Sequence, residues 1–213
     1  MIDIATLTTY ILVVLGFVFI PGPATLLTVA RATSSGTRVG IATGLGIAVG
    51  DIIHTAMAVF GVSALIYASA FLFSLVKYAG AAYLVYLGIR AILARAPVDG
   101  APTDIVVRSG PRSASAAFRQ AIIAEMLNPK TALFFLAFLP QFVRPEHGLV
   151  LLQLAVFGLI LVALGLLSTF VFAISAGRVG AMLRWNPLVL RWQGKMVGAI
   201  YCALGVRLAL QEK

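Results

Sequence analysis

Six long apolar runs constrain this chain more than any other feature of its sequence. They cover about Leu7–Ala30, Val39–Ile66, Phe71–Leu93, Phe118–Val143, Leu149–Ala176 and Leu190–Leu210. A helix that crosses the hydrocarbon core of a bilayer needs about 20 mostly apolar residues, and each run is long enough. Only 11% of the residues are charged, whereas a soluble domain keeps about a quarter. The sequence therefore predicts an all-α membrane protein with six transmembrane helices in the lipid bilayer.

The longest connection between these runs extends from Ala94 to Ala117. It is rich in residues that interrupt helices, namely Pro97, Gly100, Pro102, Gly110 and Pro111. We interpret it as a flexible linker that divides the chain into two sets of three helices. The expected organisation is a single transmembrane domain over 1–213, with a first repeat at about 1–93, a cytoplasmic linker at about 94–117 and a second repeat at about 118–213.

The distribution of basic residues predicts the orientation. Loops 1–2, 3–4 and 5–6 hold eleven of them: Arg31, Arg38, Arg90, Arg95, Arg108, Arg112, Arg119, Arg178, Arg184, Arg191 and Lys195. The other side has four: Lys77, Arg144, Arg207 and Lys213. Because cytoplasmic loops carry the excess of Lys and Arg, we expect both termini on the non-cytoplasmic side. Membrane topology also accounts for the net charge of +9, so no nucleic-acid partner is expected.

Two pairs of motifs indicate an internal repeat. The pattern K-x-x-G-A-x-Y, followed by G-x-R, occurs once around Gly80 and again around Gly198, an offset of 118 residues. A second pattern, [G/N]-P-x-T, occurs at Gly22 and at Asn128, an offset of 106. Three helices in each half place the second repeat upside down relative to the first. Inverted repeats of this kind recur in secondary transporters.

Helix-breaking residues lie inside the first and fourth runs. Pro21-Gly22-Pro23 should open a turn in the first helix, because each proline lacks an N–H and clashes with the carbonyl four residues back. That turn frees the carbonyls of Phe17 and Phe19. Asn128-Pro129 has the form of an N-cap followed by Pro at the first helical position. We expect helices 1 and 4 to be broken at mid-membrane depth.

Each predicted half-helix carries a threonine at its third position, Thr25 in the first and Thr131 in the second. The free N–H groups and the positive dipole end at such a terminus favour a carboxylate. A simple proline kink is the alternative for either break alone. Matched breaks in both halves favour a binding site.

Four ionisable residues lie inside the second and fourth apolar runs, away from their ends: Asp51, His54, Glu125 and Lys130. An ionised side chain at the centre of a bilayer is costly, so each should face a cavity or a partner. One alternative is a structural salt bridge between Lys130 and Asp51 or Glu125. His54, one helical turn after Asp51, is either a hydrogen-bonded packing residue or a proton carrier.

Glycines precede Asp51 in the second run, at positions 40, 44, 46 and 50. We interpret them as packing residues that let another helix approach closely. The pairs Gly40/Gly44 and Gly46/Gly50 also predict a homodimer, although the same motif serves packing within one subunit. No Cys/His cluster and no nucleotide-binding glycine loop occurs in the sequence, so neither a metal nor another cofactor is expected.

In these motifs the sequence resembles the LysE/RhtB family of amino-acid exporters. The matching parts are F-I-P-G-P at Phe19–Pro23, the glycines that end in Gly50-Asp51, and N-P-K-T-A-L-F-F at Asn128–Phe135. The resemblance implies proton-driven export of amino acids or close derivatives from the bacterial cytoplasm, across the inner membrane. It does not fix the substrate, because members differ among basic, neutral and hydroxylated amino acids.

A zwitterionic substrate needs donors for its carboxylate and an acid for its ammonium. We assign substrate binding to Pro21, Gly22, Pro23, Thr25, Asp51, Glu125, Asn128, Pro129, Lys130 and Thr131, and proton coupling to Asp51, Glu125 and His54. No residue is assigned a catalytic role. The alternatives are a passive channel, an exporter of another small solute, a membrane scaffold, and an intramembrane enzyme that uses Asp51 and His54 as acid and base.

Overall fold

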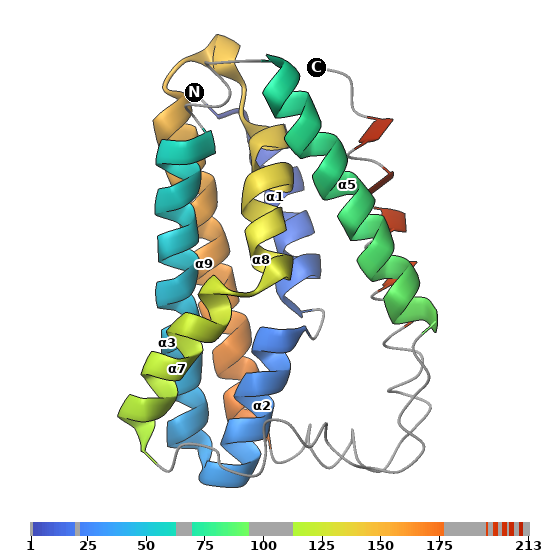
Figure 1. Cartoon of the computed structure of the whole chain (residues 1–213). Coiled ribbons are helices and arrows are strands. Elements are labelled where there is room, and N and C mark those ends of the chain that lie inside the picture. Colours follow the sequence, from blue (N-terminus) through green and yellow to red (C-terminus); the bar gives the residue numbers. More distant parts are fainter. Residues whose placement is uncertain are drawn as a thin grey trace.

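The computed structural model of the chain describes residues 2–19, 22–62, 70–93 and 113–176, and separate helical positions between Lys195 and Leu210. Every element in this part of the chain is a helix, which confirms the all-α class (Figure 1). Pro21, linker residues 94–112 and most of the sixth predicted span lie outside the described residues.

The first span is broken where the prolines predicted it. Helix α1 covers Ile4–Phe19 and helix α2 covers Pro23–Ser35, and the two axes are bent by 48°. Gly22 is the N-cap of α2 and Pro23 its first residue, where the missing N–H is not needed. Helix α2 continues beyond the predicted end at Ala30. Arg31, which we had placed in the first loop, is therefore a buried residue of α2.

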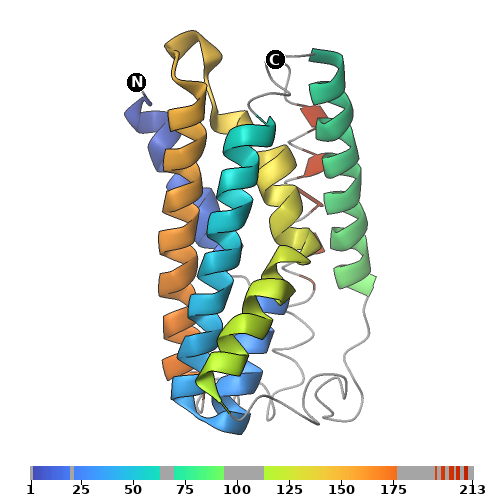
Figure 2. The ribbon, with the colours of Figure 1, turned by 60° about the vertical axis from the view of Figure 1, so that its left-hand side comes forward.

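Helix α3, Thr37–Met57, lies at the centre of the bundle and continues into the π-helix η1, Ala58–Val62. Gly36 has φ +93°, a value that favours glycine, and reverses the chain between α2 and α3. Figure 2 shows α3 beside α7 (Ala114–Met126) and α9 (Val150–Ile174), against which it packs extensively. A Cβ at Gly40 would lie 2.5 Å from that of Ala32, and one at Gly50 would lie 2.6 Å from that of Glu125. The α3 glycines thus serve packing within the chain, and these faces are not free for a second copy.

The fourth span is broken as well. Helix α7 covers Ala114–Met126 and α8 covers Pro129–Leu133. The axis of α7 is bent by 46° from that of the segment Pro129–Phe142, which begins with α8. The π-helix η2, Phe134–Phe138, and the 3-10 helix η3, Leu139–Phe142, continue from α8. Ser113 caps α7, so this helix begins at Ala114 rather than at the predicted Phe118. The short helix η4, Pro145–His147, then leads to α9, Val150–Ile174.

Helix α5, Ala70–Leu93, packs against the described positions of the C-terminal segment (Figure 1). A Cβ at Gly88 would lie 2.6 Å from the carbonyl oxygen of Gly198 and 2.5 Å from the Cys202 sulfur. A Cβ at Gly205 would lie 2.8 Å from the carbonyl oxygen of Ala81. The two segments therefore cross in close backbone contact at two places.

Membrane-spanning length is present in several helices of the described part. Thr37–Gly61 and Val150–Ile174 are each long and apolar enough to cross a bilayer. Each of the two bent pairs also qualifies when it is counted as one broken span. The chain is therefore a membrane protein with two to four candidate spans among its described residues.

The bundle has two ends, which we call the Asp3 end and the Gly36 end. Both helix breaks lie near the middle between them (Figure 1). An aromatic cluster fills the bundle between the breaks and the Asp3 end, and consists of Tyr10, Phe17, Phe134, Phe135, Phe138, Phe142 and Phe157. The Tyr10 hydroxyl donates to the Phe157 carbonyl over 2.7 Å, which satisfies its buried polar atom.

Candidate functional site

A cavity of about 50 Å³ lies where the two broken spans meet α3 and α9. Seven residues from the predicted site line it: Gly22, Thr25, Asp51, Glu125, Asn128, Lys130 and Thr131. The remaining lining residues are Phe17, Val18, Ala24, Ile47, Leu161, Gly165, Ser168 and Thr169. Pro23 and Pro129 do not line it, and act instead as the first residues of α2 and α8. Residues from four separate segments of the chain thus converge on one space.

Two carboxyl groups meet at this cavity. Asp51 comes from the middle of α3 and Glu125 from the end of α7, and their side chains are 4% and 3% exposed. The two carboxyl groups interact electrostatically. Two neighbouring buried carboxylates repel each other when both are ionised, so a proton on one member of the pair relieves the repulsion. The site therefore places two acids where they can share one proton.

The α7–α8 break holds the Glu125 carboxylate in place. The Asn128 side-chain amide donates to both Glu125 oxygens over 3.2 Å, and the Thr131 hydroxyl donates to Oε1. The Asn128 carbonyl oxygen meanwhile accepts from the Lys130 N–H at 3.1 Å and caps α8. Side chains at the N-terminus of α8 therefore already bind a carboxylate of the protein itself.

The α1–α2 break has a different chemistry. Its N-cap is Gly22, which has no side chain to offer, and no cap bond is formed there. The N–H groups of Ala24 and Thr25 belong to the first turn of α2 and have no acceptor within the helix. Both residues line the cavity. Of the two breaks, this one has residues with spare backbone donors at the cavity and no carboxylate side chain at its cap.

Lys130 connects the two breaks. Its ammonium donates to the Phe17 carbonyl over 3.0 Å and lies 4.2 Å from the centre of the Phe17 ring. The Phe17 carbonyl is one of those that the proline break was predicted to free. Asp51 and Glu125 both act on the Lys130 charge electrostatically. A cation from the second half of the chain therefore donates to a backbone carbonyl near the end of α1, in the first half.

His54 contacts the break but does not line the cavity. Its Nε2 donates to the Glu125 carbonyl over 3.1 Å, since a carbonyl oxygen can only accept. The ring stacks on Phe135 with centroids 5.6 Å apart. His54 thus reaches the backbone of the residue whose carboxyl group pairs with Asp51.

Helix α9 contributes residues that sequence reasoning missed. Leu161, Gly165, Ser168 and Thr169 line the cavity from one face of this helix. The Ser168 hydroxyl donates to the Val18 carbonyl over 2.9 Å and so satisfies another carbonyl at the end of α1. Ser168 and Thr169 form the one adjacent polar pair in α9, a signal that could have marked this face.

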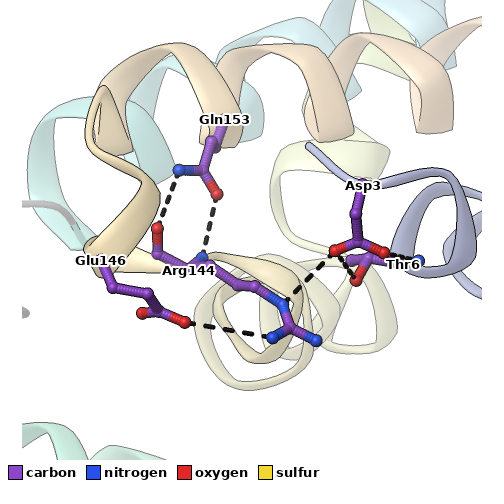
Figure 3. Close-up of polar contacts among 5 residues, drawn as sticks. All are labelled: Asp3, Thr6, Arg144, Glu146 and Gln153. Carbon is purple, nitrogen blue, oxygen red and sulfur yellow. Dashed lines mark hydrogen bonds and ion pairs between the residues drawn. The ribbon is translucent and has the colours of Figure 1, made fainter. Parts of the chain in front are cut away.

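A second polar cluster lies at the Asp3 end, away from the cavity (Figure 3). Gln153 is buried and donates to the carbonyls of Arg144 and Gly148 while its oxygen accepts from the Arg144 N–H. The Arg144 side chain lies 3.6 Å from the Asp3 carboxylate. Hydrogen bonds from the Thr6 backbone N–H and hydroxyl hold the pKa of Asp3 below its ordinary value. This cluster connects the start of α1 to the loop before α9.

No group of three or more His, Cys, Asp or Glu side chains suited to a metal ion occurs within the described ranges.

The comparison with known families decides the class of protein. Residues 15–212 match the family described as LysE type translocator. The chain belongs to the LysE type translocator family. This confirms the resemblance seen in the sequence, and membership places the protein among transporters rather than enzymes.

Members similar to this chain come from several bacteria. An uncharacterized membrane protein of Vibrio cholerae is 31% identical over 209 residues, which cover 97% of this chain and 98% of the relative. An uncharacterized membrane protein of Pseudomonas aeruginosa is 33% identical over 204 residues, or 94% and 93% of the two chains. A leucine efflux protein of Salmonella typhimurium is 36% identical over 136 residues, or 63% and 62%. No solved structure matches this chain.

Proposed function

We propose that this LysE type translocator exports amino acids or close derivatives from the cytoplasm in exchange for protons. The observation that carries the proposal is the Asp51–Glu125 pair, with Lys130 beside it, at a cavity between two broken helices. Similarity to a leucine efflux protein supports an amino acid as the exported solute. Pro21, a predicted member of the site, lies outside the described residues.

Substrate recognition follows from the difference between the two breaks. The N–H groups of Ala24 and Thr25, together with the Lys130 ammonium, form the subsite for the substrate carboxylate. Asp51 accepts the substrate ammonium. Glu125 is already held by Asn128 and Thr131, so we assign it the role of a proton partner for Asp51.

Coupling to protons uses one carboxylate for two ligands. When Asp51 carries a proton it has no charge for the substrate ammonium, and when it loses the proton it can bind the substrate. His54 donates a hydrogen bond to the Glu125 carbonyl, and we assign it as the next group on the proton path. Moving one charge through 100 mV supplies about 2.3 kcal/mol, enough for roughly fifty-fold accumulation.

The transport movement rests on two inverted three-helix repeats in a six-helix fold. The repeat relates Gly80 to Gly198 and Gly88 to Gly205. The close approach of Gly88 to Gly198 is matched by that of Gly205 to Ala81, the neighbour of Gly80. A pair of contacts exchanged in this way supports a two-fold relation between the repeats. Alternating access then consists of one repeat rocking against the other.

We place the Gly36 end in the cytoplasm and both termini outside it, in the bacterial inner membrane. The excess of Lys and Arg in the predicted loops 1–2, 3–4 and 5–6 supports this orientation. The aromatic cluster then lies on the outer side of the cavity. Its side chains must move apart before the substrate can be released. The glycine faces of α3 are filled within the chain, so they provide no support for a homodimer.

Transport by purified protein in liposomes tests the proposal. With an acidic lumen, protons leave down their gradient, and we expect labelled amino acid to accumulate inside above the external concentration. Addition of a protonophore should abolish this accumulation. Flux that only equalises the two concentrations, with or without the gradient, would indicate the passive-channel alternative. Absence of flux for every amino acid would direct attention to other small solutes.

A further inference from the structure

Gly165 lies at the middle of the α9 face that borders the cavity. Leu161, Ser168 and Thr169 line the same cavity and stand four residues before, three after and four after it, so all four share one helical face. A Cβ at Gly165 would lie 3.5 Å from Asp51 Oδ2 and 3.9 Å from Val18 Cγ1, and both of these residues line the cavity. A side chain at this position would therefore extend into the cavity.

The α3 glycines that face neighbouring helices have a packing reason that Gly165 lacks. A Cβ at Gly44 would lie 2.8 Å from Thr169 Oγ1, and one at Gly50 would lie 2.6 Å from Glu125 Cβ. Such contacts forbid a side chain without movement of a neighbouring helix. At Gly165 both neighbours are at ordinary van der Waals distance, so the fold accepts alanine there. Glycine at this position leaves room in the cavity and does not bring two helices together.

We propose that Gly165 sets the size limit for the side chain of the transported amino acid. This inference rests on the proposed function and assigns a specificity residue within the same site. A Cβ at Gly165 would lie 3.5 Å from the Asp51 carboxylate, which takes the ammonium, and 3.9 Å from the apolar side chain of Val18. It would thus occupy space next to the α-carbon of a substrate bound at Asp51, where the substrate side chain begins. Phe17, Ile47 and Leu161 are apolar residues that line the same cavity, which suits an uncharged aliphatic side chain.

A graded substitution tests the inference. Wild type, Gly165→Ala and Gly165→Val are reconstituted in liposomes with an acidic lumen, and uptake of glycine, alanine, valine and leucine is measured. The readout is the ratio of leucine to alanine uptake within each variant, which cancels differences in the amount of active protein. We expect Gly165→Ala to lower this ratio about ten-fold or more, the usual effect of one misfitting methyl group in an apolar site. Gly165→Val should exclude still smaller substrate side chains. It should therefore lower the ratio of alanine uptake to glycine uptake.

Gly16→Ala in α1 is the matched control. No atom lies within 4 Å of a Cβ at this exposed helical glycine, so the change has the same effect on helix propensity without entering the cavity. Its ratios should equal those of wild type. An unchanged leucine-to-alanine ratio in both Gly165 variants would overturn the inference while leaving proton-driven export intact. A wild-type protein that moves no amino acid would instead contradict the proposed function itself.

Discussion

Asn128 uses the two ends of its side-chain amide for different tasks: its nitrogen donates to both Glu125 oxygens at 3.2 Å, and its oxygen caps α8 at the Lys130 N–H. A single residue thereby fixes the helix break and the acid beside it. The counterpart of Asn128 in the first half is Gly22, 106 residues earlier, which can do neither. The two breaks are alike in backbone form and different in chemistry.

The first prediction concerns this double role. Asn128→Ala removes a helix cap and two donors to a buried carboxylate, so we expect a loss of about 2–4 kcal/mol in stability. Ser113→Ala is the control, because Ser113 caps α7 at an exposed site and touches no carboxylate. That variant should lose about 1 kcal/mol. Thermal unfolding in detergent measures both, and an equal loss in the two variants would contradict the role assigned to Asn128.

Substitution of Gly88 tests the packing of α5 on the C-terminal segment. A Cβ at Gly88 would lie 2.6 Å from the carbonyl oxygen of Gly198 and 2.8 Å from the backbone nitrogen of Cys202. Gly88→Ala therefore forces the two segments apart, and we expect a loss of about 1–3 kcal/mol in stability. Gly16→Ala is the control and should lose no stability, because no atom lies within 4 Å of a Cβ there. Thermal unfolding in detergent measures both, and a Gly88→Ala variant as stable as wild type would contradict this close contact.

At the Asp3 end, we predict that Gln153 matters more for stability than the ion pair beside it. Gln153→Leu keeps the volume but removes three hydrogen bonds to the loop backbone, which should cost about 1–3 kcal/mol. Asp3→Asn should have a small effect, because the Asp3–Arg144 pair is solvent-exposed. Thermal unfolding in detergent compares the two variants. A larger loss from Asp3→Asn would contradict this ranking.

The effect of Asp3 has a defined pH dependence. Hydrogen bonds from the Thr6 N–H and hydroxyl keep the folded-state pKa of Asp3 below the ordinary value of 3.8. Its contribution is therefore present above that value and is lost as the pH falls through the lowered one. The difference between wild type and Asp3→Asn should disappear at acidic pH. A difference that grows on acidification would contradict the hydrogen bonds described here.

Much of the backbone could be predicted from local sequence. Proline and N-cap residues act on their own helix, so the breaks at Gly22-Pro23 and Asn128-Pro129 were visible without tertiary information. The α3 glycines predicted close packing for a similar reason, since a missing side chain permits close approach whichever helix arrives. Class and family followed from the same motifs.

The partners of the buried groups could not be predicted in this way. Lys130 contacts the carbonyl of Phe17, and Ser168 that of Val18, across more than a hundred residues of sequence. Helical periodicity marks a polar face but does not tell which helix it meets. Arg31 was misplaced in a loop because a charge near the end of an apolar run usually marks that end. In the structure its guanidinium donates to the Ala117 carbonyl and to Gln120.

Topology provides a further prediction. A reporter enzyme that is active only outside the cytoplasm should function when fused to the C-terminus. It should fail when inserted in the linker between residues 94 and 112. The reason is the concentration of Lys and Arg in the predicted loops 1–2, 3–4 and 5–6. The opposite pattern of activity would reverse the orientation and place the aromatic cluster on the cytoplasmic side of the cavity.

Proton-driven transport by Asp51→Asn tests the central claim most directly. The amide keeps the shape of the side chain and removes both its proton and its charge. We predict that the variant folds with near wild-type thermal stability, binds amino acid more weakly, and no longer accumulates it in liposomes with an acidic lumen. Loss of folding would point to a structural role in balancing Lys130. Accumulation equal to wild type, and still dependent on the pH gradient, would contradict the account and move the coupling to Glu125.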